Sequence, residues 1–148
     1  MQKKHYSIQI NAPREKVWDT MLGRETYREW TSAFSPGSDY KGSWDQGAEI
    51  RFIGPGEGGE TGMLARIKEN RLHEFVSIEH YGMIENGVED TTSEKVKAWA
   101  GAHENYTFAD RDGGTEILID IDVEDGYAQM FDDMWPRALQ ALKELAER

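Results

Sequence analysis

The feature that most limits the fold is a series of segments in which apolar and polar residues alternate. The clearest is residues 117–123, where apolar side chains at every second position enclose Asp120 and Asp122. This alternation is typical of a β-strand with one face buried and the other in water. Similar segments lie around residues 6–10, 48–52, 63–67, 76–79 and 106–108, and turn sequences such as residues 69–71 and 112–114 separate several of them. The sequence therefore predicts a largely antiparallel sheet.

Helical spacing appears directly after the first of these strands. Asn11 suits the cap of a helix and Pro13 suits its first turn, and an apolar stripe that includes Val17 follows them. A second short helix is expected to carry Tyr27 and Trp30. The sequence thus predicts two short helices between the first strand and the rest of the sheet.

The last segment is predicted to be a long helix from about Tyr127 onward. Its apolar side chains recur at helical spacing and form one stripe: Tyr127, Met130, Phe131, Met134, Trp135, Ala138, Leu142 and Leu145. Pro136 lies inside this segment and is expected to bend the helix, because proline lacks a backbone donor. The order of strand, two helices, several antiparallel strands and long helix predicts an α+β fold.

Local signatures in this order resemble a known superfamily. Residues 10–18 resemble the opening of SRPBCC proteins, also called START-like or polyketide-cyclase-like, and residues 42–47 and Gly62 extend the similarity. Residues 135–142 resemble the branch of homologues of the heat-shock chaperone ATPase activator. The resemblance implies a helix-grip fold, with a curved antiparallel sheet of about six or seven strands, two short N-terminal helices and a long C-terminal helix over a central pocket. It covers essentially the whole chain, so we expect a single domain over residues 1–148.

Composition narrows the classes of function. The chain of 148 residues has no cysteine, which excludes disulfides, thiol catalysis and thiolate metal sites. Its net charge of −11 opposes the phosphate backbone, so no nucleic acid is expected as a partner. No apolar stretch has the length of a membrane span or signal peptide, so we expect no membrane span and a cytoplasmic protein.

The resemblance also implies a pocket between sheet and helix, which different superfamily members use for lipids, hormones, polyketides or other apolar molecules. Aromatic and methionine side chains are suited to line such a pocket. The candidate lining residues are Trp30, Phe34, Phe52, Met63, Tyr106, Phe108, Met130, Met134 and Trp135. The alternative is that these residues are ordinary core. The leading hypothesis is non-catalytic binding of a small apolar molecule of lipid, polyketide or aromatic type, by a monomer or homodimer.

Metal and cofactor chemistry has little support in the sequence. The chain contains four histidines, none at a recognised metal-ligand spacing: His5, His73, His80 and His103. We therefore expect no metal site and no cofactor.

Acid–base chemistry would need polar groups brought together from separate strands. Glu79, His80, Glu104 and Tyr106 are the candidates. Neighbours along a strand point to opposite faces, so Glu79 and His80 form no pair by themselves. Because no local motif joins a nucleophile to a base, we predict that no two of the four converge in the pocket and that no residue is catalytic.

Two other classes of function stay open. An enzyme of cyclase, dehydratase or hydrolase type would bury paired polar groups in the cavity. A chaperone ATPase regulator is suggested by the branch resemblance alone. The acidic residues 85–94 are predicted to form a solvated loop followed by a short helix over residues 93–99, and the alternative is a lid with Trp99 over the pocket mouth.

Overall fold

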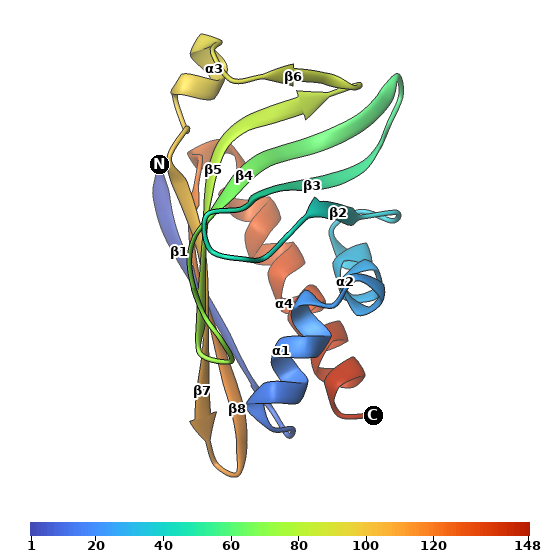
Figure 1. Cartoon of the computed structure of the whole chain (residues 1–148), viewed down its shortest axis with the longest axis vertical. Coiled ribbons are helices and arrows are strands. Elements are labelled where there is room, and N and C mark those ends of the chain that lie inside the picture. Colours follow the sequence, from blue (N-terminus) through green and yellow to red (C-terminus); the bar gives the residue numbers. More distant parts are fainter.

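All strands of the chain belong to one curved antiparallel sheet, shown in Figure 1, in a computed structural model that describes residues 1–148. The strands are β1 (Gln2–Ile10), β2 (Asp39–Gly42), β3 (Glu49–Gly56), β4 (Gly59–Arg71), β5 (Phe75–Glu85), β6 (Val88–Asp90), β7 (Ala102–Arg111) and β8 (Gly114–Val123). Their order across the sheet is β1-β8-β7-β5-β4-β3-β2, and β6 pairs with β5. The antiparallel α+β prediction is confirmed, with eight strands in place of six or seven.

Three of the four α-helices cover the concave side of the sheet. The α-helices are α1 (Arg14–Leu22), α2 (Arg24–Trp30), α3 (Glu94–Lys97) and α4 (Ala128–Ala146), and the short 3-10 helices are η1 (Thr31–Ala33) and η2 (Asp125–Tyr127). In Figure 1, α1, α2 and α4 lie together on one side, while α3 lies apart from them near β6. No helix combines the length and the hydropathy needed to cross a bilayer.

The main core lies between this helical layer and the sheet. Ile117, Ile119 and Ile121 of β8 are buried in it, as their alternation predicts. From α4, the buried side chains of the main core are Trp135, Ala138, Leu139, Leu142 and Ala146. The long C-terminal helix therefore packs on the concave face, as expected.

The first two residues of the predicted apolar stripe are exposed, so the stripe was predicted too long at its N-terminal end. Tyr127 precedes the helix and is 48% exposed, and Met130 is 40% exposed. Successive helical residues are about 100° apart, so Met130 lies roughly 140° around the axis from Trp135 and cannot share its buried face. The helix continues through Pro136, which is exposed.

Two irregularities in the pairing of β4 with β5 shape the middle of the sheet. The register shifts between Leu64 and Ala65 and again between Ile67 and Glu69. Such bulges bend a strand and increase its twist. Leu64 is buried outside the main core, together with Ile84, Val96 and Trp99, whereas Ala65 belongs to that core. Adjacent strand residues face opposite sides, so Leu64 faces away from the main core. Trp99, the residue of the alternative lid hypothesis, is also buried outside that core.

Candidate functional site

A cavity of about 240 Å³ lies between the concave face of the sheet, α2 and α4. Nine of its thirteen lining residues are hydrophobic. The full lining is Tyr27, Trp30, Thr31, Phe34, Ser38, Phe52, Met63, His80, Glu104, Tyr106, Ile121, Phe131 and Trp135. Residues 85–94 and Trp99 are not among them, so the acidic segment is not a lid on this cavity; part of it forms β6, paired with β5.

Six of the nine predicted lining residues are brought together at this cavity. They are Trp30, Phe34, Phe52, Met63, Tyr106 and Trp135. The other three lie elsewhere, which corrects the prediction. Phe108 is buried beneath α1, with its ring centroid 4.9 Å from that of Trp18. Met130 and Met134 lie outside the lining. The helical phase turns Met130 away from the buried face that Trp135 occupies, and Met134 is only half-buried beside that face.

Aromatic side chains hold one another in place around the cavity. Trp135 is 3% exposed, and its ring centroid lies 4.9 Å from Phe34, 6.1 Å from Trp30 and 6.2 Å from Tyr106. A ring of Tyr6 stacks on it at 6.0 Å. These separations are within the range in which aromatic pairs stabilise each other. The apolar wall is therefore built by mutual packing of residues from both ends of the chain and from the sheet.

A buried polar cluster interrupts this apolar wall. Nε2 of His80 lies 3.1 Å from Oε1 of Glu104, and the hydroxyl of Tyr106 donates a hydrogen bond to Oε2 of the same carboxylate. The His80 and Glu104 side chains are only 10% and 15% exposed. We call these three residues the Glu104 cluster. The prediction that no two candidate polar groups converge in the pocket is therefore wrong.

The strand register explains how the cluster forms. Opposite His80 in the β5–β7 ladder stands Ala102, and opposite Glu104 stands Ile78, so His80 and Glu104 are diagonal neighbours on one face. Diagonal neighbours remain within reach when the side chains are long. Tyr106 lies two residues after Glu104 and so shares its face.

The tyrosines of the cavity have raised pKa values because they are withdrawn from water. Burial raises the pKa of Tyr106 well above its usual value, and the Glu104 carboxylate raises it further, so Tyr106 stays a hydrogen-bond donor. Burial and then Glu104 also raise the pKa of Tyr27, another lining residue. Nδ1 of His80 is buried without a hydrogen-bond partner, as is Nε1 of Trp135. No lysine or arginine lines the cavity.

The fourth candidate polar residue lies on the other side of the sheet. Oε2 of Glu79 is 3.8 Å from Nε2 of His103, and these side chains are 23% and 40% exposed. Glu79 and His103 stand directly opposite each other in the ladder, on the face away from His80. Neither residue of this outer pair lines the cavity.

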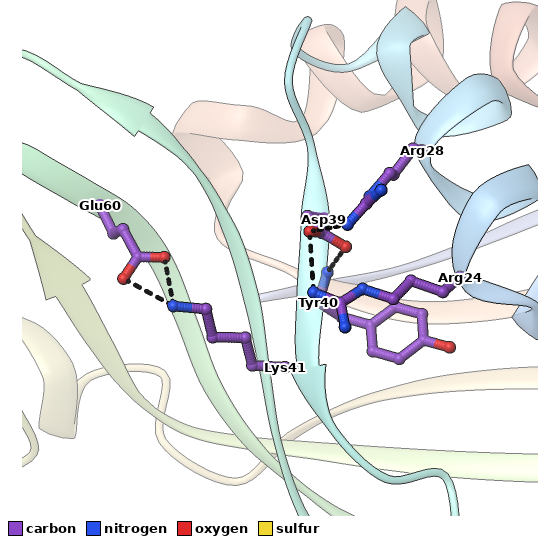
Figure 2. A network of polar contacts seen from close by, with 6 residues as sticks. All are labelled: Arg24, Arg28, Asp39, Tyr40, Lys41 and Glu60. Carbon is purple, nitrogen blue, oxygen red and sulfur yellow. Dashed lines mark hydrogen bonds and ion pairs between the residues drawn. The ribbon is translucent and has the colours of Figure 1, made fainter.

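The wall formed by α2 is anchored through the network in Figure 2, where Arg24 and Arg28 reach from the helix to Asp39 on β2. Nη2 of Arg28 lies 2.9 Å from Oδ2 of Asp39, and the backbone nitrogen of Tyr40 donates to Oδ1 at 2.8 Å. The hydrogen bond from Arg28 is the main cause that lowers the pKa of Asp39 to about 2. Asp39 therefore stays ionised and joins α2, which carries Tyr27 and Trp30, to the edge of the sheet.

The arrangement favours binding and proton exchange over metal chemistry. The structure contains no group of three or more His, Asp or Glu side chains placed to hold a metal ion. The Glu104 cluster offers a carboxylate, an imidazole and a phenol beside apolar rings. Such a set can orient a ligand by hydrogen bonds, and a carboxylate–imidazole pair can also exchange a proton with one.

Solved structures of low sequence identity share the fold. A protein from Cytophaga hutchinsonii has a TM-score of 0.72 at 18% identity, over 99% of this chain and 94% of that chain. The Aha1 dimer from Colwellia psychrerythraea has a TM-score of 0.70 at 17% identity, over 99% and 97%. The AHSA1-like protein from Aeromonas hydrophila has a TM-score of 0.71 at 15% identity, over 97% and 90%. At these identities, the similarity establishes the fold alone.

The family comparison covers nearly the whole sequence. A search among curated proteins found no significant match. The family described as "Activator of Hsp90 ATPase homolog 1-like protein" matches residues 11–147. This confirms the resemblance seen in residues 10–18 and 135–142. The chain therefore belongs to the Activator of Hsp90 ATPase homolog 1-like family, which is of the SRPBCC type.

Proposed function

We propose that the chain binds a small, largely apolar molecule in the cavity between the sheet and α4. The observation that carries the proposal is the cavity itself, of about 240 Å³, in which nine of thirteen lining residues are hydrophobic. Apolar pockets with a few convergent polar groups are the usual form of small-molecule sites. Here, the Glu104 cluster supplies those polar groups.

The size of the cavity limits the ligand. A 150 Å³ apolar cavity is known to accept benzene, so about 240 Å³ corresponds to roughly ten non-hydrogen atoms. A diacyl lipid greatly exceeds this size. Of the ligand types considered from the sequence, the cavity therefore favours a compact aromatic molecule.

Direct binding measurements test the proposal. We expect a panel of one- and two-ring compounds to include ligands that give saturable heats by isothermal titration calorimetry. Met63→Trp places a larger side chain in the lining and should abolish binding. Leu118→Trp adds the same group on the outer face, where Leu118 is 36% exposed, and should leave binding intact. Absence of binding across the panel, or equal binding by both variants, would contradict the proposal.

Acid–base catalysis is the second candidate, and the contact of 3.1 Å between His80 and Glu104 specifically favours it. Binding alone predicts that a ligand is recovered unchanged after prolonged incubation. Catalysis predicts a new product whose formation is lost in Glu104→Gln and His80→Ala while the affinity for the ligand persists. Mass spectrometry of the incubated ligand separates the two. Regulation of a chaperone ATPase, the activity in the family name, is a separate hypothesis that no geometry described above favours.

A further inference from the structure

The cavity combines one acidic group with many aromatic rings, and neither lysine nor arginine lines it. Seven of the thirteen lining residues are Phe, Tyr or Trp, and Glu104 is the one carboxylate among them. The faces of aromatic rings carry negative electrostatic potential and attract cations. The lining therefore combines two kinds of group that can attract a cation, a carboxylate and aromatic rings, around the same small volume.

The carboxylate of Glu104 also retains capacity for another donor. A carboxylate offers about four acceptor sites. One is used by His80 and one by Tyr106. No lysine or arginine lies within ion-pair distance of it, and His80 is its one imidazole neighbour. A desolvated carboxylate gains most from a partner that brings positive charge, because burial strengthens electrostatic attraction.

The charge of the whole chain acts in the same direction. A net charge of −11 attracts cations to the protein and repels anions. An anionic ligand would enter a cavity that holds Glu104 and offers no lysine or arginine to neutralise it. Carboxylate ligands such as fatty acids are therefore disfavoured, and the remaining classes are cations and neutral hydrogen-bond donors.

We propose that the cavity selects compact aromatic amines, with the ammonium group against the Glu104 carboxylate and the ring among the aromatic side chains. The aromatic rings favour a cation over a neutral donor, because only the cation interacts with their faces as well as with the carboxylate. This inference rests on the binding function proposed above and adds the charge of the ligand. The ligand would contain about ten non-hydrogen atoms, as the cavity volume indicates.

Three probes of nearly equal size test the charge preference: 2-phenylethylamine, 2-phenylethanol and phenylacetate. Calorimetry with the unmodified protein at neutral pH should show the amine binding at least tenfold more tightly than the alcohol, and phenylacetate more weakly than both. An alcohol that equals the amine, or a preference for phenylacetate, overturns the inference. This comparison needs no variant, so it holds even where a substitution disturbs folding.

Two variants, each of which removes one negative charge, distinguish a local effect of Glu104 on the amine preference from an effect of the net charge. Glu104→Gln should abolish the preference for the amine and change the affinity for the alcohol by less than about threefold. Glu79→Gln, in the same pair of strands but on the other face, should retain the preference. A preference that survives Glu104→Gln overturns the inference. If other compact aromatics bind and none of the three probes does, the inference alone fails; if no compound binds, the proposed function fails with it.

Discussion

Two histidine–glutamate pairs join β5 to β7, one on each face of the sheet. The inner pair, His80 and Glu104, is diagonal in the ladder, 3.1 Å apart and at most 15% exposed. The outer pair, Glu79 and His103, is directly opposed, 3.8 Å apart and up to 40% exposed. The residue types and the two strands are the same, but the face of the sheet, the register and the exposure differ.

The surroundings of each pair decide its role more than its composition does. Water screens the outer pair, so its contribution to stability is expected to be small. The inner carboxylate is withdrawn from water, which makes each of its hydrogen bonds stronger and its loss more costly. We therefore expect substitutions around the inner pair to destabilise the protein more than matched substitutions on the outer face.

Deleting a large side chain should reveal the greatest difference between the faces. Trp135→Ala removes an indole that is 3% exposed and contacts rings from several elements, so we expect a loss of about 3–5 kcal/mol in the free energy of unfolding. Leu118→Ala, on the outer face, should cost about 1 kcal/mol or less. Urea denaturation of both variants measures the difference. Similar losses would mean that the outer face is itself packed against a partner.

Removal of one hydroxyl tests the inner cluster more finely. In Tyr106→Phe, Glu104 loses a buried hydrogen-bond donor, and bonds to charged groups contribute about 1.5–3 kcal/mol. The matched variant is Tyr81→Phe on the same sheet, where the ring lies 5.0 Å from the Arg66 guanidinium, and its expected change is within about 0.5 kcal/mol. Equal effects in chemical denaturation would show that the Tyr106 hydrogen bond contributes nothing special.

A pH series tests the anchor that holds α2 against β2. The pKa of Asp39 is lowered to about 2 from 3.8, so its ion pairs stabilise the fold above about pH 4, and this contribution is lost as the pH falls toward 2. We expect Asp39→Asn to cost about 0.5–1 kcal/mol at neutral pH. The gap in unfolding free energy between wild type and variant should close between pH 4 and pH 2.

The control for this anchor is Glu60→Gln, which disrupts the exposed pair with Lys41 drawn in Figure 2. Both side chains of this pair are at least 50% exposed, so Glu60→Gln should change the free energy of unfolding by less than Asp39→Asn does. A pH-independent gap for Asp39→Asn would contradict the assignment of its charge to the anchor.

The outer pair should show the smallest effect of all. Glu79→Gln and His103→Ala are each expected to change the free energy of unfolding by less than about 0.5 kcal/mol. Thermal denaturation at low and at high salt checks this, because salt screens exposed ion pairs, so any contribution of the pair should be largest at low salt. A loss comparable with that of Tyr106→Phe would remove the distinction between the two faces.

Sequence patterns predict much of this architecture because they reflect local geometry. Alternation shows which residues of a strand share a face, so Ile117, Ile119 and Ile121 could be placed in the core, and Glu79 could be separated from His80. Helical spacing likewise locates α4. The strands β2 and β6 have only four and three residues, which is too short for a periodic pattern.

The Glu104 cluster could not be predicted because it depends on register. His80 and Glu104 are 24 residues apart, separated by β6 and α3, and nothing local states which residue faces which across β5 and β7. Alternation within each strand does predict that Tyr106 shares a face with Glu104 and that Ile78 shares a face with His80, because each pair is two positions apart. The misplaced Met130 has a different cause, because the predicted stripe extended beyond the arc of α4 that meets the sheet.

The pairing of the first strand with the last has a consequence for synthesis of the chain. β1 joins the sheet only through β8, where Ile10 stands opposite Thr115, about a hundred residues later. At a translation rate of 5–20 residues per second, β1 waits roughly 5–20 s for this partner. During that interval the apolar side of β1, with Ile8 and Ile10, has no sheet to join. We therefore expect the nascent chain to need protection from aggregation until β8 leaves the ribosome, and the cavity to form only when α4 follows.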